Sequence, residues 1–227
     1  MSVVLHGYSF SVYRRIARLA LEEKGLAYTC VEVDPFATPV PETYLAMHPF
    51  GRVPTLVHGD FVLYETVAIT RYVDEAFDGP PLQPDEPRQR ARMQQVISII
   101  DSYGYWPLVR QVFSHGVFRP MRSLPGDRDQ VSQGLVASAR VLHALERLVA
   151  PGPFFLGDRI SLADIHLAPM VAYFAAAPEA AAMISHYPGL SDWWTRMADR
   201  PTMQQTIPDW TSLAPAGTDR PQSQGPG

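Results

Sequence analysis

The sequence is poor in the features that mark several specialised classes of protein. Its 227 residues include one cysteine, Cys30, which excludes an intrachain disulfide framework and a CxxC metal site, so we predict no bound metal. No apolar run approaches the ~20 residues that cross a bilayer, because His166 and Pro169 interrupt the longest candidate. The N-terminus also lacks a basic segment followed by an apolar one. We therefore expect a soluble, cytoplasmic protein.

Neither sign of charge is in large excess. Nineteen basic and 23 acidic residues give a formal net charge of -4. This balance provides no strong attraction to polyanions, so we expect neither a nucleic-acid nor a membrane partner. Hydrophobic residues make up 46% and charged residues 19%, which is typical of a globular protein with a sizeable core.

Proline divides the chain into unequal parts. Four of the 22 prolines fall between residues 80 and 87, where they would interrupt a helix or a central strand. We predict a first domain over residues 1–78, a linker over 79–87 and a second domain over 88–210. The remaining residues, 211–227, are rich in Pro, Gly, Ser, Thr and Gln, which predicts a mobile C-terminal tail.

The first part predicts a mixed α/β domain. Short apolar runs at 3–5 and 28–33 flank a helical pattern over 11–24, and this order implies a right-handed crossover between parallel strands. Two further strands, 54–57 and 61–64, are separated by a Gly-containing turn and followed by a helical pattern over 65–77. The added hairpin makes the predicted sheet mixed.

The second part is helical almost throughout. Apolar residues recur at helical spacing over 88–114, 129–148 and 161–175, with shorter helices expected near 179–184 and 191–199. We expect Pro107 to kink or end the first of these helices. Ser161 and Asp164 form a capping-box pattern, so we expect Asp164 to be structural.

Three segments in order carry a family resemblance. They are SVYRRIARLALEEKGL (residues 11–26), HPFGRVPTL (48–56) followed by ETVAI (65–69), and GDRISLADI (157–165). The set resembles the cytosolic glutathione transferases, and a serine-type or related bacterial class, over about residues 3–205. The resemblance implies a thioredoxin-like N-terminal domain and an all-α helical domain. It further implies glutathione as co-substrate, a small hydrophobic electrophile as partner, a role in detoxification, and a homodimer with Phe50 as a possible apolar anchor.

The resemblance also implies a set of glutathione contacts. Val53 would present its backbone to the cysteinyl part of glutathione ahead of a cis Pro54. Glu65 would bind the γ-glutamyl ammonium, and Thr66, at a helix start with free N–H groups, would bind the adjacent carboxylate. Arg52 would bind the glycyl carboxylate through its guanidinium. His48 is a weaker candidate, because a surface or core role suits it equally.

The catalytic hydroxyl has more than one candidate. Ser11 precedes the first helix in register with the family's reactive position, although Val12 stands where proline is usual. Tyr8, just after the first strand, is the rival, and Ser9 is a weaker third option. A hydroxyl donor at a helix N-terminus stabilises a thiolate. Cys30, by contrast, lies in a predicted strand with an alternating residue pattern, and we expect it to be buried and inert.

Aromatic residues provide a possible electrophile pocket between the domains. The expected lining residues are Tyr8, Phe10, Tyr105, Trp106 and Phe113, since small-molecule sites are mostly apolar. The same scaffold could also support a glutathione-dependent isomerase, a dehalogenase or an ether-cleaving enzyme, or a non-enzymatic glutathione-binding module, because fold does not fix function.

Overall fold

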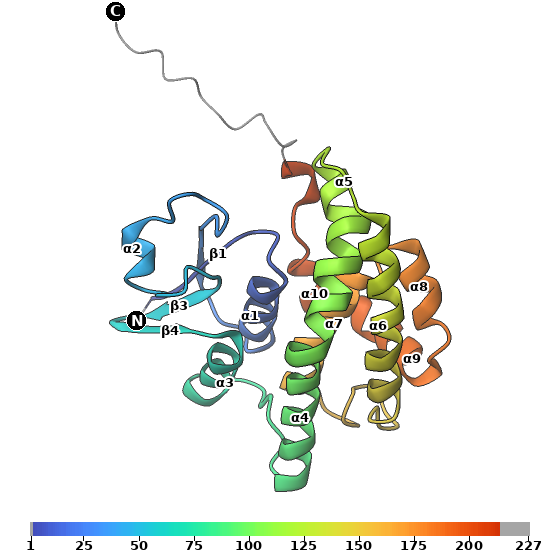
Figure 1. The fold of residues 1–227 in the computed structure, drawn as a ribbon. Helices are drawn as coiled ribbons and strands as arrows, with labels where there is room; N and C mark the ends of the chain where they lie inside the picture. Colours follow the sequence, from blue (N-terminus) through green and yellow to red (C-terminus); the bar gives the residue numbers. More distant parts are fainter. Residues whose placement is uncertain (1, 214–227) are drawn as a thin grey trace, which may run out of the picture.

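A computed structural model describes residues 2–213 and joins a four-stranded sheet to a helical bundle (Figure 1). The strands are β1 (Val3–Gly7), β2 (Thr29–Glu32), β3 (Thr55–His58) and β4 (Phe61–Tyr64), in the order β2-β1-β3-β4. β1 runs parallel to β2 and antiparallel to β3, which pairs antiparallel with β4. The predicted mixed sheet is therefore confirmed.

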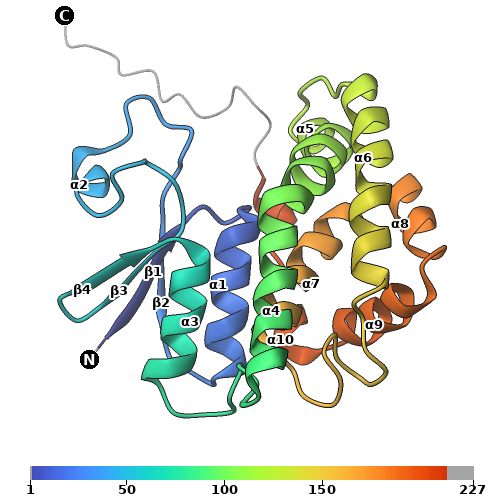
Figure 2. The same ribbon diagram turned by 60° about the horizontal axis from the view of Figure 1, so that its bottom comes forward.

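Three helices belong to the sheet-containing part. They are α1 (Val12–Glu23), α2 (Glu42–Leu45) and α3 (Thr66–Ala76). α1 forms the crossover between the parallel strands β1 and β2, and it packs beside α3 (Figure 2). The predictions had located α1 and α3 but not α2.

The second part begins with one long helix. α4 (Pro87–Ile99) continues through wider turns at Ile100–Gly104 and Trp106–Phe118 into α5 (Arg119–Met121). The remaining elements are α6 (Arg128–Glu146), α7 (Leu162–Phe174), α8 (Pro178–Ile184), α9 (Pro188–Ala198), α10 (Pro201–Gln205) and a final 3₁₀ turn, Trp210–Ser212. The 14 residues beyond 213, which include most of the predicted mobile tail, lie outside the described residues.

Pro107 does not end the long helix, so that half of the expectation for it is wrong. Pro107 is the second residue of the Trp106–Phe118 segment, whose turns are of the wide i→i+5 type. Pro107 itself has no N–H to donate to a preceding carbonyl, and the turns around it are wide rather than α-helical. The helical path still runs on to Met121.

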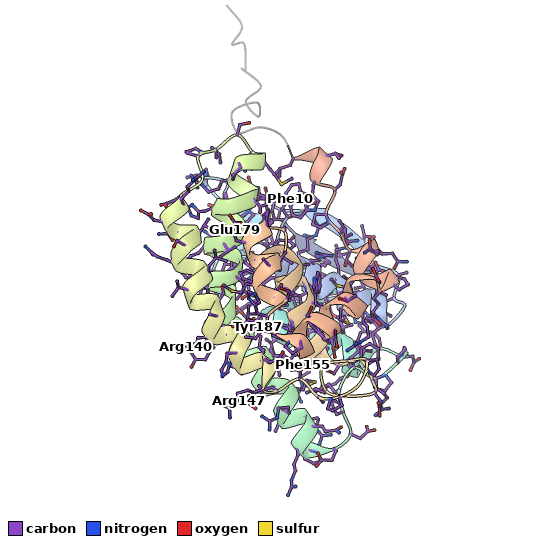
Figure 3. All side chains as sticks on the ribbon, turned by 90° about the vertical axis from the view of Figure 1, so that its right-hand side faces the viewer. Phe10, Arg140, Arg147, Phe155, Glu179 and Tyr187 are labelled. Carbon is purple, nitrogen blue, oxygen red and sulfur yellow. The ribbon has the colours of Figure 1, made fainter. Side chains whose placement is uncertain are left out.

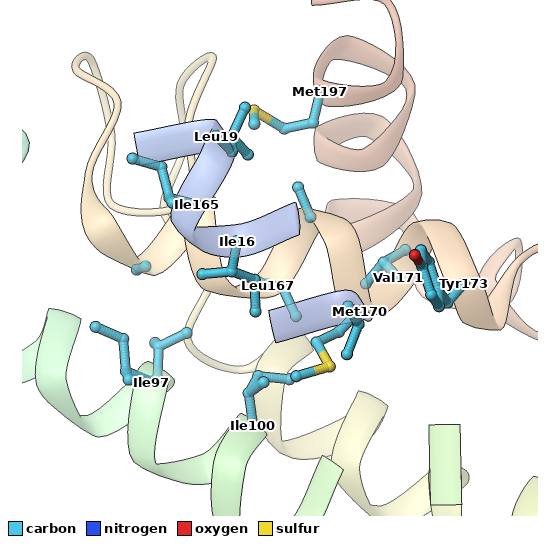
Figure 4. Packing of buried hydrophobic residues seen from close by; sticks show 14 of the residues in the cluster. Ile16, Leu19, Ile97, Ile100, Ile165, Leu167, Met170, Val171, Tyr173 and Met197 are labelled. Carbon is cyan, nitrogen blue, oxygen red and sulfur yellow. The ribbon is translucent and has the colours of Figure 1, made fainter. Parts of the chain in front are cut away.

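The two parts share one hydrophobic core. Ile16 and Leu19 of α1 are fully buried, as their helical spacing predicted, and point toward the helical part (Figure 4). α1 packs on α7, and α7 in turn packs on α4 and α9. Fully buried side chains from these helices include Ile165, Leu167 and Met170. This packing fixes the first part against the second and so defines the space between them.

Asp164 has the structural role that its capping pattern predicted. It is fully buried, and its two carboxylate oxygens accept hydrogen bonds from Ser161 N–H (2.9 Å), Phe155 N–H (2.7 Å) and Trp193 Nε1 (2.8 Å). Burial raises the pKa of Asp164. The carboxylate therefore joins the start of α7 to the preceding loop and to α9.

Cys30 is exposed rather than buried. It lies in β2, an edge strand that pairs with β1 alone, and all four residues of this strand are exposed. The alternating pattern was correct for a strand, but burial depends on what covers the strand.

Within residues 2–213, no helix is both long and apolar enough to cross a membrane.

Candidate active site

A cavity of about 690 Å³ lies between the sheet-containing part and the long helix that follows α4. One side is formed by the loops after β1 and before β3 and by the start of α3, and the other by residues 101–118. All of the predicted catalytic and glutathione-binding residues line it: Tyr8, Ser11, Arg52, Val53, Pro54, Glu65 and Thr66. Residues far apart in the sequence thus meet around one space.

Ser11 is the N-cap of α1. Its Oγ accepts a hydrogen bond from Arg14 N–H (3.3 Å), and its own N–H donates to the Tyr8 carbonyl (2.9 Å). Because the cap uses the oxygen as an acceptor, the hydroxyl proton remains available to a ligand. Val12 occupies the first helical position and is buried, so the cap forms without the proline that is usual in the family.

Tyr8 is half-buried among aromatic rings. Its ring meets Phe10 and Phe36 edge-on, with centroid distances of 5.4 and 5.8 Å. Burial raises the pKa of Tyr8, and nearby Arg122 opposes this rise. The hydroxyl is therefore protonated near neutral pH, but a raised pKa makes it a weaker proton donor to a thiolate.

Ser9 is already engaged in a polar cluster. Its Oγ donates to Glu32 Oε2 (2.6 Å) and accepts from Arg14 Nη1 (2.7 Å). Ser9 is also not among the residues that line the cavity. The geometry therefore favours Ser11 and Tyr8 over Ser9.

The loop before β3 has the expected cis peptide bond between Val53 and Pro54. The Tyr44 hydroxyl donates to the Arg52 carbonyl (2.6 Å) and lies 3.1 Å from Thr55 Oγ1. These contacts hold both ends of the turn, so the Val53 backbone faces the cavity in a fixed position.

Glu65 has an unusual backbone conformation at the start of α3. Its φ of 72° is positive, a region that non-glycine residues rarely occupy and that costs about 1–3 kcal/mol. Thr66, the first residue of α3, is buried at the cavity wall. Strain of this kind is typical of residues held in place for binding.

Asp101 adds a carboxylate that the sequence predictions missed. It lines the cavity from the wide helical turn after α4, and its Oδ1 is buried without a hydrogen-bond partner among the described residues. Burial raises the pKa of Asp101 to about 6; the charge of Glu65 adds to this rise, and the Tyr13 hydroxyl opposes it. Two carboxylates facing one space suit a cationic group such as an ammonium. The sequence signal that could have revealed Asp101 is a single acidic residue among the apolar residues of this helical segment.

His48, which precedes the loop that carries the cis bond, also lines the cavity. It is 2% exposed, and its ring lies 4.6 Å from the Tyr64 ring. Burial lowers the pKa of His48, so a neutral imidazole is expected near pH 7. Phe50, whose ring is 6.2 Å away, is 70% exposed.

The rest of the cavity wall is largely aromatic. All five residues expected in the electrophile pocket line it, and five further aromatic residues do so that had not been predicted there. The cavity thus has one polar side and one aromatic side. The additional residues are Tyr13, Phe36, Phe50, Phe118 and Tyr173.

Family comparisons agree with this arrangement. The glutathione S-transferase N-terminal domain family matches residues 5–81, and the C-terminal domain family of the same enzymes matches residues 105–201. The chain belongs to the glutathione S-transferase family. Within the family, it is 33% identical over 202 residues to the probable glutathione S-transferase GSTF2 of Oryza sativa subsp. japonica, covering 87% of this chain and 91% of that protein.

Further relatives support the same assignment. Glutathione S-transferase 3 of Zea mays is 31% identical over 206 residues, or 88% of this chain and 91% of that protein. The solved structure of maize glutathione S-transferase I with an atrazine glutathione conjugate has a TM-score of 0.79 at 26% identity, covering 91% and 96% of the two chains. The thioredoxin-like domain followed by a helical domain is therefore confirmed.

The expected class within the family is not supported. The sequence features suggested a serine-type or related bacterial class, whereas both curated relatives described above are plant enzymes. The motifs that carried the resemblance are shared across the family, so they identify the family rather than its class.

Proposed function

We propose that this protein conjugates the thiolate of glutathione to a small hydrophobic electrophile, with Ser11 as the catalytic hydroxyl. The thiolate sulfur donates an electron pair to the electrophilic carbon, the bond to the leaving group breaks, and the leaving group departs with its electrons. The thiol proton passes to solvent. The observation that carries this proposal is a single cavity with a polar side and an aromatic side, reached by the free hydroxyl proton of Ser11.

Glutathione would bind along the polar side. Glu65, with Asp101 nearby, pairs with the γ-glutamyl ammonium, and Thr66 with the free N–H groups of α3 binds the adjacent carboxylate. The backbone of Val53 pairs with the cysteinyl unit. Arg52, which is exposed at the rim, binds the glycyl carboxylate bidentately. The thiol is then directed toward the start of α1.

Ser11 would lower the pKa of the glutathione thiol. A charge-assisted hydrogen bond contributes about 1.5–3 kcal/mol, and the N-terminus of α1 adds about 0.3–1 kcal/mol. At 1.36 kcal/mol per pKa unit, these contributions would lower the thiol pKa from about 8.5 to about 6–7. Half or more of the bound thiol would then be ionised near pH 7. The raised pKa of Tyr8 supports Ser11 over Tyr8 for this role.

We further propose a two-domain homodimer that acts in the cytoplasm, where glutathione is kept reduced. The structural breaks support the proposed linker, since α3 ends at Ala76 and α4 begins at Pro87. The strong exposure of Phe50, together with Phe61 at 45%, supports an apolar contact between subunits.

Two measurements test the proposed function together. Titration calorimetry with glutathione tests the polar side of the cavity, and thiol consumption with 1-chloro-2,4-dinitrobenzene tests the complete reaction. We expect both binding and turnover. Binding without turnover across a panel of aryl and alkyl halides would contradict the transferase proposal and favour a glutathione-binding module. Absence of binding would contradict both.

A further inference from the structure

The C-terminal segment of the described chain returns to the first domain. Glu23 at the end of α1 accepts two hydrogen bonds from Arg200, at 2.5 and 2.6 Å, and another from Thr202. Farther up the same helix, Arg15 donates to the Met203 carbonyl (3.1 Å) and Arg18 to the Gln205 carbonyl (3.0 Å). Residues 200–205 are thus anchored along α1.

This anchoring brings Trp210 onto Phe10, the residue just before Ser11. The two rings stack, with centroids 5.4 Å apart and planes 28° from parallel. Trp210 also meets Tyr173 at 5.7 Å and Phe113 at 5.8 Å. In Figure 3, Phe10 lies at the same end of the molecule as the last described turn of the chain.

A hydrogen bond from the second domain holds the same loop. The Tyr173 hydroxyl donates to the Phe10 carbonyl oxygen at 3.2 Å. Phe10 is therefore held at its ring by Trp210 and at its backbone by Tyr173. Phe10, Phe113 and Tyr173 all line the cavity, whereas Trp210 is not among the lining residues and packs behind them.

We propose that Trp210 is a positioning residue that determines specificity for flat aromatic electrophiles. By stacking on Phe10 and packing against Phe113 and Tyr173, whose own rings lie 4.6 Å apart, it holds the rings of the aromatic side in fixed positions. Rings of this kind bind a flat aromatic group through stacked and edge-on contacts. Correct placement of the electrophile relative to the thiolate also affects the rate, because small displacements lose the reactive geometry. The inference rests on the proposed transferase function.

The effect of removing Trp210 should be selective. In Trp210→Ala, Phe10 loses its stacking partner, and we expect KM for 1-chloro-2,4-dinitrobenzene to rise about 5- to 20-fold. KM for glutathione should stay within about twofold, because the polar side lies on other elements. Turnover of an alkyl iodide, which has no ring to stack on the aromatic side, should change less than threefold.

Three further variants make the test specific. Trp210→Phe keeps a ring and should restore most of the affinity for the aryl halide, whereas Trp210→Leu keeps apolar bulk without stacking and should behave like Trp210→Ala. Trp194→Phe changes a tryptophan that packs on Trp193 outside the cavity and should have no effect. Equal losses for aryl and alkyl electrophiles, no loss at all, or full activity in Trp210→Leu would overturn the proposal.

A binding measurement separates this inference from the proposed function. S-benzylglutathione carries an aromatic ring and needs no turnover. Calorimetry should show that Trp210→Ala lowers the affinity for S-benzylglutathione by about 5- to 20-fold. The affinity of the variant for glutathione itself should stay within about twofold of the wild-type value. Unequal losses would support the inference even if no electrophile is consumed. Equal affinities of the wild type and the variant for S-benzylglutathione would overturn it even if the transferase reaction is observed.

Discussion

The polar and aromatic sides of the cavity are assembled differently. The polar side comes mainly from the first domain, where Val53, Pro54, Glu65 and Thr66 fall within 14 consecutive residues. The aromatic side combines the loop before α1, the long helix after α4 and Tyr173 of α7, supported from behind by Trp210. Local turns and helix starts thus determine one side, and packing between domains determines the other. Variants on the two sides should therefore have separable effects.

The largest separable effect is expected on the polar side, at Glu65. Glu65→Ala leaves the γ-glutamyl ammonium without one of its two proposed carboxylate partners, and we expect glutathione binding to weaken by about 2–3 kcal/mol, roughly 30- to 150-fold. Calorimetry measures this change. Glu65→Gln, which keeps the size but not the charge, is the matched control and should lose most of the same affinity. An unchanged affinity in Glu65→Ala would remove Glu65 from the site.

Ser11 lies where the polar and aromatic sides of the cavity meet, and replacing it tests the proposed catalytic hydroxyl. Ser11→Ala should lower turnover at pH 7 by roughly ten- to thirtyfold, because the ionised fraction of the thiol falls back toward ~3%. Glutathione affinity should stay within a few fold. The loss should shrink above pH 9, where the thiol ionises without help. Steady-state rates between pH 6 and 9.5 give the profile.

Tyr8→Phe is the control for Ser11. It removes the rival hydroxyl and keeps the ring that packs on Phe10 and Phe36. We expect its pH–rate profile to match that of the wild type. If Tyr8→Phe shows the pH-dependent loss and Ser11→Ala does not, the assignment of Ser11 is wrong and the tyrosine is the catalytic hydroxyl.

Asp101 should give a smaller effect that depends on pH. Its pKa of about 6 means that the carboxylate that pairs with the ammonium is present above pH 6 and lost below it. Glutathione affinity of the wild type should therefore fall as the pH drops from 8 to 5. Asp101→Asn should bind about 3- to 10-fold more weakly at pH 8 and equally at pH 5. Parallel pH profiles of the two proteins would exclude Asp101 from the binding site.

Asp101→Asn should weaken glutathione binding at pH 8 but increase the stability of the folded protein at the same pH. The folded pKa of Asp101 lies above its unfolded value of about 3.9. The ionised carboxylate therefore destabilises the fold above pH 4, most fully above pH 6, and this penalty disappears below pH 4. Asp101→Asn should raise the unfolding midpoint at pH 8 and leave it unchanged at pH 4, which thermal unfolding can measure.

The smallest expected effect on the cavity comes from Phe50. Phe50→Asp should dissociate the proposed homodimer, because a charge would replace a 70% exposed phenyl ring at the proposed subunit contact. Light scattering should report about twice the chain mass of 25.3 kDa for the wild type and the chain mass for the variant. Glutathione affinity should change less than fivefold. A wild-type monomer at micromolar concentration would refute the dimer.

The sequence predicted the parts of the site that depend on local bonding. The cap at Ser11, the cis bond before Pro54 and the helix start at Thr66 each need only a few consecutive residues, and the structure forms all of them. The buried capping pair of Ser161 and Asp164 was predictable for the same reason.

The errors fall where burial or packing decides. Cys30 had a correct strand pattern, but its exposure depends on the edge position of β2. Pro107 was expected to kink or end a helix, but the helical path does not end there and instead changes from α-helical to wide turns. Asp101 looked like one acid in an apolar helix, and only the approach of α3 and α1 turns it toward Glu65 and Tyr13. Periodicity does not reveal which neighbour covers a residue.

The sequence by itself thus determined the mixed sheet, the family and most of the polar side of the cavity, because hydrogen-bonding and capping patterns act between near neighbours in the chain. The sequence also predicted five aromatic residues of the other side, but only the tertiary structure showed Tyr173 beside them and Trp210 behind them. Phe10, Phe113, Tyr173 and Trp210 are spread over 200 residues, and they meet because α1 packs on α7 and its arginines hold the C-terminal segment. The specificity proposed for them would follow from that packing.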